Sequence, residues 1–218
     1  MNLGFYISIK ATRFSKILDI DNSEMLKSIK VVFSDDVKND YLMSRLSQLN
    51  IPYILLNYKD ISPNQKDKNL FLSDTLLDIL KKHEIDYCFS FGAHILKGDL
   101  LEQYKNKIIN FHPSLLPQFP GKKAIDQAVD ANSNMLGNTA HFIDKGVDTG
   151  PIILQSIQHV NVFYEKGYDG VLDIQLEMYK KLYSLLKDKR IKVIDNKVYI
   201  QGADYSSYKI FPQIATEN

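Results

Sequence analysis

Short apolar runs alternate with stretches of helical spacing along the first half of the chain. The apolar runs predict buried strands at residues 3–9, 29–33, 51–56, 87–91 and 108–111. Apolar residues three and four positions apart predict helices at residues 12–26, 41–49 and 72–83, with Ser73 as the N-cap of the last helix. Because strands and helices take turns, this half predicts an α/β fold in which helices pack on a mainly parallel sheet.

The second half of the chain has a different pattern. Residues 138–143 and 151–160 predict two further strands, and residues 169–186 predict a long helix. The turn pair Asp195-Asn196 lies between two short β-rich runs and predicts a β-hairpin. We therefore expect a core at residues 1–160, followed at residues 161–218 by a C-terminal helix and hairpin. The aromatic residues of this segment belong either to a dimer surface or to the core: Tyr199, Tyr205, Tyr208 and Phe211.

Composition narrows the classes of protein that fit. The chain has 218 residues, with 27 Lys and Arg against 26 Asp and Glu, and this balance argues against a nucleic-acid coat or a polybasic membrane binder. The single cysteine, Cys88, excludes an intramolecular disulfide framework and a cysteine-based zinc site. We expect no metal, no nucleic-acid partner and no membrane partner. The first residues do not resemble a secretory signal, so a cytoplasmic location is expected.

Polar side chains gather where two predicted strands end. One cluster, residues 90–94, follows the fourth strand, and another, residues 110–114, follows the fifth. Asn110 and His112 point the same way because side chains alternate along a strand. A third polar element contains Asp148 and Gly150, and the glycine permits a tight turn. Ligands bind at the carboxyl ends of the strands in open parallel sheets, so these elements are the candidate site.

These segments resemble the formyltransferase family, whose enzymes use 10-formyltetrahydrofolate. The resemblance rests on the runs Asn-Phe-His-Pro-Ser-Leu-Leu-Pro at residues 110–117, Phe-Pro-Gly at 119–121, Gly-Asn-Thr-Ala-His-Phe at 137–142 and Asp-Thr-Gly-Pro-Ile-Ile-Leu-Gln at 148–155. It is strongest over residues 86–160 and implies a Rossmann-like sheet with an added antiparallel portion. Residues 1–160 would then be the formyltransferase catalytic core, and residues 161–218 a possible dimer interface of a homodimer.

The resemblance also implies an enzyme with a catalytic trio, Asn110, His112 and Asp148. In that role Asn110 and His112 donate hydrogen bonds to the oxygen of a tetrahedral intermediate. His112 then passes a proton to the departing folate nitrogen, and Asp148 keeps His112 charged and accepts the proton of the amine. In contrast, His141 lies within a predicted strand and is expected to be a core histidine.

Two further sets of residues follow from the same resemblance. The segment that would hold the folate comprises His94, Ile95 and Leu96, with a second loop at Ile143, Asp144, Lys145, Gly146 and Val147. The purine-pathway branch of the family often has Arg in place of His94. The residues expected to bind the acceptor are Lys10, Thr12, Arg13, Pro113, Ser114 and Glu177.

The acceptor is the least defined part of this prediction. Purine-pathway members carry a glycine-rich phosphate loop after the first strand, but residues 8–14 here contain no glycine. Lys10, Thr12 and Arg13 would bind phosphate by charge instead; the alternative is that Thr12 simply caps the first helix. Likewise, Glu177 either contacts the acceptor or is an exposed helix residue. In lacking the glycine-rich loop the chain most resembles the nucleotide-sugar N-formyltransferases, and this resemblance implies a dTDP-linked amino-dideoxy sugar as the acceptor, in surface polysaccharide (O-antigen, lipopolysaccharide) synthesis. The alternative is phosphoribosylglycinamide formyltransferase; a formyltetrahydrofolate hydrolase and a non-catalytic binding module rank lower.

Overall fold

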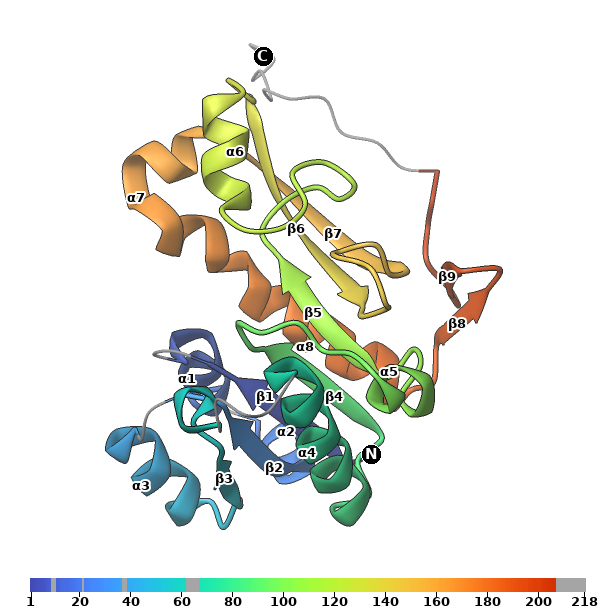
Figure 1. The fold of residues 1–218 in the computed structure, drawn as a ribbon. Helices are drawn as coiled ribbons and strands as arrows, with labels where there is room; N and C mark the ends of the chain where they lie inside the picture. The colour runs from blue at the N-terminus through green and yellow to red at the C-terminus, as the bar shows by residue number, and fades with distance from the viewer. Residues whose placement is uncertain (9–10, 21, 37–38, 62–66, 207–218) are drawn as a thin grey trace.

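A seven-stranded sheet forms the centre of the protein (Figure 1). The structure is a computed structural model, which describes residues 1–8, 11–20, 22–36, 39–61 and 67–206. The strand order is β3-β2-β1-β4-β5-β6-β7. The first five strands are parallel, whereas β6 and β7 run antiparallel to their neighbours. The bounds are β1 (Leu3–Ile7), β2 (Ile29–Ser34), β3 (Tyr53–Leu55), β4 (Tyr87–Phe91), β5 (Ile108–His112), β6 (Met135–Phe142) and β7 (Ile152–His159).

Helices cover both faces of the sheet because the strand side chains are apolar on both sides. Phe5 belongs to the core cluster shared with α1, α3 and α8, while its neighbour Tyr6 belongs to the cluster under α4 and α5. A third cluster joins α6 and α7 to β6. The helices are α1 (Thr12–Leu18), α2 (Ser23–Ser28), α3 (Asp40–Gln48), the short 3₁₀ helix η1 (Tyr58–Asp60), α4 (Lys68–Lys82), α5 (Asp99–Gln103), α6 (Ala124–Asp130), α7 (Asn161–Leu172) and α8 (Ile174–Lys187).

Several helix boundaries differ from the predicted ones, and each difference has a local cause. The predicted helix at 12–26 is two helices, and the second begins after Asn22, whose side chain accepts from the amide of Met25. The prediction that Ser73 is an N-cap is wrong. Helix α4 starts earlier, with Asp67 accepting from the amide of Leu70, and Ser73 lies buried inside the helix.

Helix α7 lies largely outside the predicted helix at 169–186. Gly167 has φ 65° within α7, so the helical path is interrupted there and the apolar spacing does not run through it. Helices α7 and α8 meet at Asp173, and α8 packs on β6, β7 and α1. Figure 1 shows α7 beside α6 and the far end of β6, and α8 across the sheet.

The predicted hairpin is confirmed as β8 (Ile191–Ile194) and β9 (Lys197–Ile200). Asp195 and Asn196 have φ values of 48° and 60°, the left-handed conformation that a two-residue hairpin turn of type I′ requires. Tyr199 and Tyr205 are exposed, whereas Tyr208 and Phe211 lie outside the described residues. The homodimer, and the division of the chain at residue 160, remain predictions.

The predicted fold class is confirmed: a mixed, mostly parallel sheet with flanking helices, then a C-terminal helix and a hairpin. The chain leaves β1 toward β2 on one side, and β4 lies on the other side of β1. The carboxyl ends of β1 and β4 therefore flank the point where the strand order reverses, which is where open α/β sheets bind ligands. None of the described helices is long and apolar enough to cross a membrane.

Candidate active site

Strand β5 presents two of the predicted catalytic residues to one cavity. Asn110 and His112 are two positions apart, so both side chains project from the same face of the strand. They line a cavity of about 270 Å³, here called cavity A, together with Asp148. His112 is nearly buried, with 6% of its side chain exposed. The structure thus brings the whole predicted trio together.

Asp148 reaches this cavity from the connection between β6 and β7. Its backbone has φ 55°, a conformation that Asp tolerates better than most residues. Its Oδ2 atom accepts a hydrogen bond from the amide of Gly121 at 2.7 Å and lies 3.2 Å from Nδ1 of His112. The connection approaches β6 so closely that a Cβ on Gly150 would lie 1.8 Å from the carbonyl oxygen of Phe142. Glycine at 150 is therefore needed to place Asp148.

Both ring nitrogens of His112 face oxygen atoms. Nε2 lies 2.8 Å from the carbonyl oxygen of Phe119, and because a carbonyl can only accept, Nε2 carries a proton. Nδ1 faces the carboxylate of Asp148. Only the doubly protonated ring satisfies both acceptors at once. The surroundings therefore suit a histidine that donates protons.

His141 is the buried, hydrogen-bonded histidine that the sequence predicted, but it also contacts the trio, which sequence reasoning missed. It is buried on β6 directly opposite Asn110, and its Nε2 lies 3.4 Å from the amide nitrogen of Asn110 and 3.7 Å from Oδ1 of Asp148. Burial lowers the pKa of His141, which keeps the ring neutral. Its Nδ1 donates to the carbonyl oxygen of Phe142, so Nε2 is left as an acceptor for Asn110. His141 thereby orients the Asn110 amide, a role that only the antiparallel register reveals.

The predicted folate segments also line cavity A, with one exception. The residues that line it are His94, Ile95, Leu96, Ile143, Asp144, Gly146 and Val147. Lys145 instead forms an ion pair with Glu102 at 2.6 Å, outside the cavity lining. Ile95 and Val147 are more than half exposed, so cavity A has apolar side chains at its rim. Such a lining suits a flat heterocycle.

A second cavity of about 390 Å³, here called cavity B, adjoins cavity A. The two share Gly92 and Ala93 in their walls, at the end of β4. Thr12 and Arg13 line cavity B, whereas Lys10 lies outside the described residues. Thr12 is the first residue of α1 and does not cap it, because the cap position is Ala11.

Arg13 lines cavity B together with three other charged residues, Lys16, Asp169 and Asp173, and burial lowers the pKa of its guanidinium. The group lies 4.9 Å above the ring of Phe91 and donates to Oε1 of Gln175 at 3.0 Å. Gln175 in turn donates to Asn138 at 2.6 Å, so the oxygen of its amide is turned toward Arg13. Sequence reasoning missed Gln175, since nothing in the helical pattern distinguishes it. Lys16 pairs with Asp173 at 2.5 Å, whereas among the described residues no carboxylate forms an ion pair with Arg13, so Arg13 is the cation of this cavity that an anionic ligand could pair with.

The remaining predicted acceptor residues lie outside both cavities. Ser114 is buried, and its hydroxyl donates to the carbonyl oxygen of Gln118 within the connection that follows β5. Pro113 precedes it and lines neither cavity. Glu177 is exposed on α8 and pairs with Lys180 at 2.8 Å. Its neighbour Leu176 lines cavity B instead.

The side chains of cavity A are those that acyl transfer requires. An amide and a protonated imidazole can donate to an oxygen that becomes negatively charged, and a carboxylate beside them can accept a proton. Within the described part of the chain, no three His, Cys, Asp or Glu side chains are grouped so as to hold a metal ion.

Comparisons with known proteins agree with this chemistry. Residues 1–173 match the Formyl transferase family. A phosphoribosylglycinamide formyltransferase of Haemophilus influenzae is 30% identical over 206 residues, covering 92% of this chain and 93% of that protein. A formyltetrahydrofolate deformylase of Escherichia coli O6:H1 is 29% identical over 166 residues, which are 57% of its length. The crystal structure of glycinamide ribonucleotide transformylase 1 from Symbiobacterium toebii superposes with a TM-score of 0.78 at 27% identity, covering 92% of this chain and 93% of that one.

The prediction of a dTDP-linked amino sugar as the acceptor, with a role in surface polysaccharide synthesis, is wrong. The Haemophilus influenzae relative and the Symbiobacterium toebii structure, which match along almost the whole of both chains, are a phosphoribosylglycinamide formyltransferase and a glycinamide ribonucleotide transformylase. The prediction relied on the missing glycines at residues 8–14, where backbone amides would otherwise approach a phosphate. Cavity B offers the guanidinium of Arg13 at this end of the sheet instead, so the absence of glycine does not exclude a phosphorylated acceptor.

The predicted enzyme class is confirmed, and with it the family's co-substrate, 10-formyltetrahydrofolate. The family match covers most of the chain and includes every residue of the trio. This chain belongs to the formyl transferase family and is an enzyme that acts on formyl groups.

Proposed function

We propose that the chain transfers a formyl group from 10-formyltetrahydrofolate to the primary amine of phosphoribosylglycinamide. The observation that carries the proposal is the pair of adjoining cavities: cavity A contains the trio, and cavity B contains the partly buried guanidinium of Arg13, which has no ion-pair partner among the described residues. The folate would occupy cavity A. The phosphate of the acceptor would lie in cavity B near Arg13, with its amine directed past Gly92 and Ala93 toward the trio.

The reaction proposed for this site forms one C–N bond and breaks another. The acceptor amine attacks the formyl carbon, and the carbonyl oxygen becomes an oxyanion that accepts from the Asn110 amide and from the Nδ1–H of His112, because Nε2 is held by the carbonyl oxygen of Phe119. The amine loses a proton to Asp148, directly or through water. His112 gives its proton to N10 of the folate as the C–N10 bond breaks. The products are the N-formyl acceptor and tetrahydrofolate, and the proton held by Asp148 returns His112 to its starting state.

The same trio can also use water as the acceptor. The deformylase relatives make this the second candidate, since hydrolysis needs the same oxyanion contacts and the same proton transfer. Against it, a hydrolase has no use for a second cavity, lined by an arginine that forms no ion pair among the described residues, next to the reacting groups. We therefore rank transfer to an amine above hydrolysis.

One assay separates the two candidates. The purified chain is mixed with 10-formyltetrahydrofolate alone, with phosphoribosylglycinamide, or with glycinamide that lacks the ribose phosphate, and tetrahydrofolate release is followed by absorbance. We expect release that depends on phosphoribosylglycinamide and yields one formylated acceptor per folate released. Equal release without any amine would identify a hydrolase. No release under any condition would reject both functions.

A further inference from the structure

A carboxylate outside the trio lies buried at the carboxyl end of β2. Asp35 follows the last residue of that strand and is 2% exposed. It accepts hydrogen bonds from the hydroxyl groups of Tyr6 and Ser8, and from Nδ1 of His94 at 2.7 Å. A buried charge is costly unless it is paired, and among the described residues His94 is the only side chain able to supply a positive charge to Asp35. Burial and the neighbouring Asp35 raise the pKa of Tyr6, so Tyr6 stays a neutral donor.

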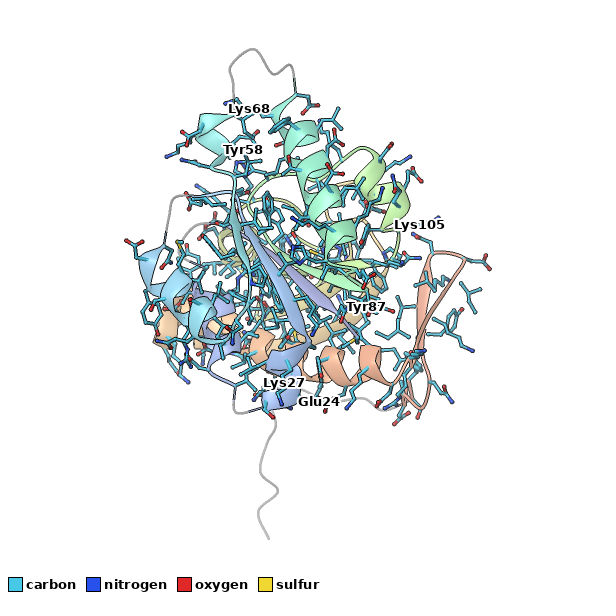
Figure 2. All side chains as sticks on the ribbon, turned by 90° about the horizontal axis from the view of Figure 1, so that it is seen from below. Glu24, Lys27, Tyr58, Lys68, Tyr87 and Lys105 are labelled. Carbon is cyan, nitrogen blue, oxygen red and sulfur yellow. The ribbon has the colours of Figure 1, made fainter. Side chains whose placement is uncertain are left out.

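His94 is held from two directions. Its ring stacks on Tyr58 with the ring centroids 3.6 Å apart and the planes 17° from parallel. Figure 2 shows Tyr58 next to Lys68, whose ammonium lies 5.8 Å from the centre of the Tyr58 ring. The Asp35 hydrogen bond fixes the other edge of the imidazole. His94 is therefore clamped in the wall of cavity A.

The backbone around His94 has no helix or strand to hold it. Residues 92–97 follow β4 and precede α5 without regular structure, yet residues 92–96 form one wall of cavity A. Side chains of other elements hold this segment: the amide of Ala93 donates to Ser8 Oγ at 2.8 Å, and the amide of Lys97 donates to Ser73 Oγ at 3.0 Å. Because Ser8 Oγ accepts from Ala93, its own proton is free to go to Asp35.

We propose that Asp35 is the positioning residue of the folate side: through His94 it fixes the segment 92–97 in the shape that binds 10-formyltetrahydrofolate. The inference rests on the proposed function, because it assumes that cavity A holds the folate. Asp35 lines neither cavity, so it acts through His94 rather than on the substrate.

Replacing Asp35 with Asn tests this role selectively. Tyr6 and His94 share the Oδ2 atom of Asp35, whereas Ser8 bonds to Oδ1. An asparagine with its oxygen toward Ser8 keeps that contact, but its NH₂ group cannot accept from His94 or from Tyr6. The His94 variants described next leave the contact between Tyr6 and Asp35 in place and so isolate the His94 contact. For Asp35→Asn we expect the KM for 10-formyltetrahydrofolate and the dissociation constant for tetrahydrofolate to rise about 10-fold, because the charge-assisted hydrogen bond to His94 is lost. The expected kcat and the KM for phosphoribosylglycinamide stay within about twofold of the wild type.

Two substitutions of His94 test whether restoring an N–H donor to Asp35 restores tetrahydrofolate binding. His94→Ala removes the contact with Asp35, whereas His94→Asn retains an N–H donor near the position of Nδ1. We expect His94→Ala to weaken tetrahydrofolate binding as much as Asp35→Asn, and His94→Asn to recover most of that loss. Equal losses in the two His94 variants would overturn the proposal, because His94 would then act on the folate through its ring. These two variants also carry the test if Asp35→Asn does not fold.

Asp86 provides a matched control. It accepts from the amide of Asn2 at 2.7 Å at the opposite edge of the sheet, just before β4. Asp86→Asn should leave tetrahydrofolate binding, measured by calorimetry, unchanged. Equal binding by the wild type and Asp35→Asn would overturn the proposal for Asp35 while leaving the proposed function intact. A wild type that does not bind tetrahydrofolate would overturn both.

Discussion

The amide nitrogen of Asn110 lies 3.4 Å from Nε2 of His141, across the antiparallel pair of β5 and β6. Because Nδ1 of His141 donates to the carbonyl oxygen of Phe142, Nε2 has only a lone pair to offer. The Asn110 side chain must therefore turn its NH₂ group toward His141, and one N–H is left to point into cavity A. A buried neutral histidine thus determines the orientation of a residue proposed to bind the oxyanion.

The first prediction concerns this contact. In His141→Phe the Asn110 amide loses its acceptor and is free to flip, which removes the oxyanion donor for part of the time. We expect kcat to fall at least about 10-fold with the KM values little changed, since an oxyanion donor acts mainly in the transition state. Initial rates of tetrahydrofolate release measure both parameters. The control is His159→Phe, because His159 is an exposed histidine at the end of β7. An equal loss of kcat in both variants would contradict the prediction.

The second prediction is the pH dependence of stability that His141 contributes. Burial lowers its pKa in the folded state below the ordinary value of 6.5. Between those two values the unfolded chain binds more protons than the folded one, so the free energy of unfolding falls as the pH falls through this window. Above pH 6.5 the residue has no such effect. Urea unfolding of the wild type and His141→Gln between pH 5 and 8 should show a shallower acid loss in the variant; parallel curves would contradict this.

The third prediction tests the roles of His112 and Asp148. His112→Asn removes the proton donor, and Asp148→Asn removes both the proton acceptor and the charge beside His112. We expect each change to lower kcat by about 100-fold or more, while tetrahydrofolate affinity stays within about threefold. Kinetics and calorimetry on the same preparations provide the two readouts. If unfolding accounted for the loss, with no defect in the folded fraction, the two residues would have a structural role only.

The trio was predictable because its geometry is mostly local. The alternation of side chains along one strand already puts Asn110 and His112 on one face, and the resemblance to the family supplied Asp148. His141 was not predictable in the same way. Its place opposite Asn110 depends on the register between β5 and β6, which the sequence of a single strand does not contain. Within an apolar run, the sequence does not distinguish a histidine that is only buried from one that also contacts a site.

The acceptor side was harder for a different reason. Arg13 and Gln175 are 162 positions apart, and their hydrogen bond joins α1 to α8 across the top of the sheet. The resemblance to the family instead drew attention to Glu177, which α8 turns toward solvent. A two-residue offset on a helix moves a side chain by about 200°, so small errors in helix phase exchange cavity residues for exposed ones.

The fourth prediction assigns acceptor affinity to Arg13. Arg13→Met keeps an apolar contact with Phe91 but removes a guanidinium from cavity B and leaves Lys16 paired with Asp173. We expect the KM for phosphoribosylglycinamide to rise about 10-fold or more, because charge-assisted hydrogen bonds to the phosphate are lost. The KM for 10-formyltetrahydrofolate should stay within about twofold. Arg45→Met is the control, because Arg45 forms an exposed ion pair with Asp19 outside both cavities. A rise of equal size in both KM values would contradict a separate acceptor cavity.

The fifth prediction concerns the backbone that carries Asp148. In Gly150→Ala the new Cβ would lie 1.8 Å from the carbonyl oxygen of Phe142, which is backbone of β6 and cannot move as a side chain would. The connection must therefore shift away from β6, and Asp148, two residues earlier, shifts with it. We expect a loss of about 1–3 kcal/mol in unfolding free energy, as in overpacked interiors, together with a lower kcat. Lys145→Ala, on the exposed part of the same connection, should change neither, and unchanged kcat in a destabilised Gly150→Ala would mean that Asp148 is placed independently of the turn.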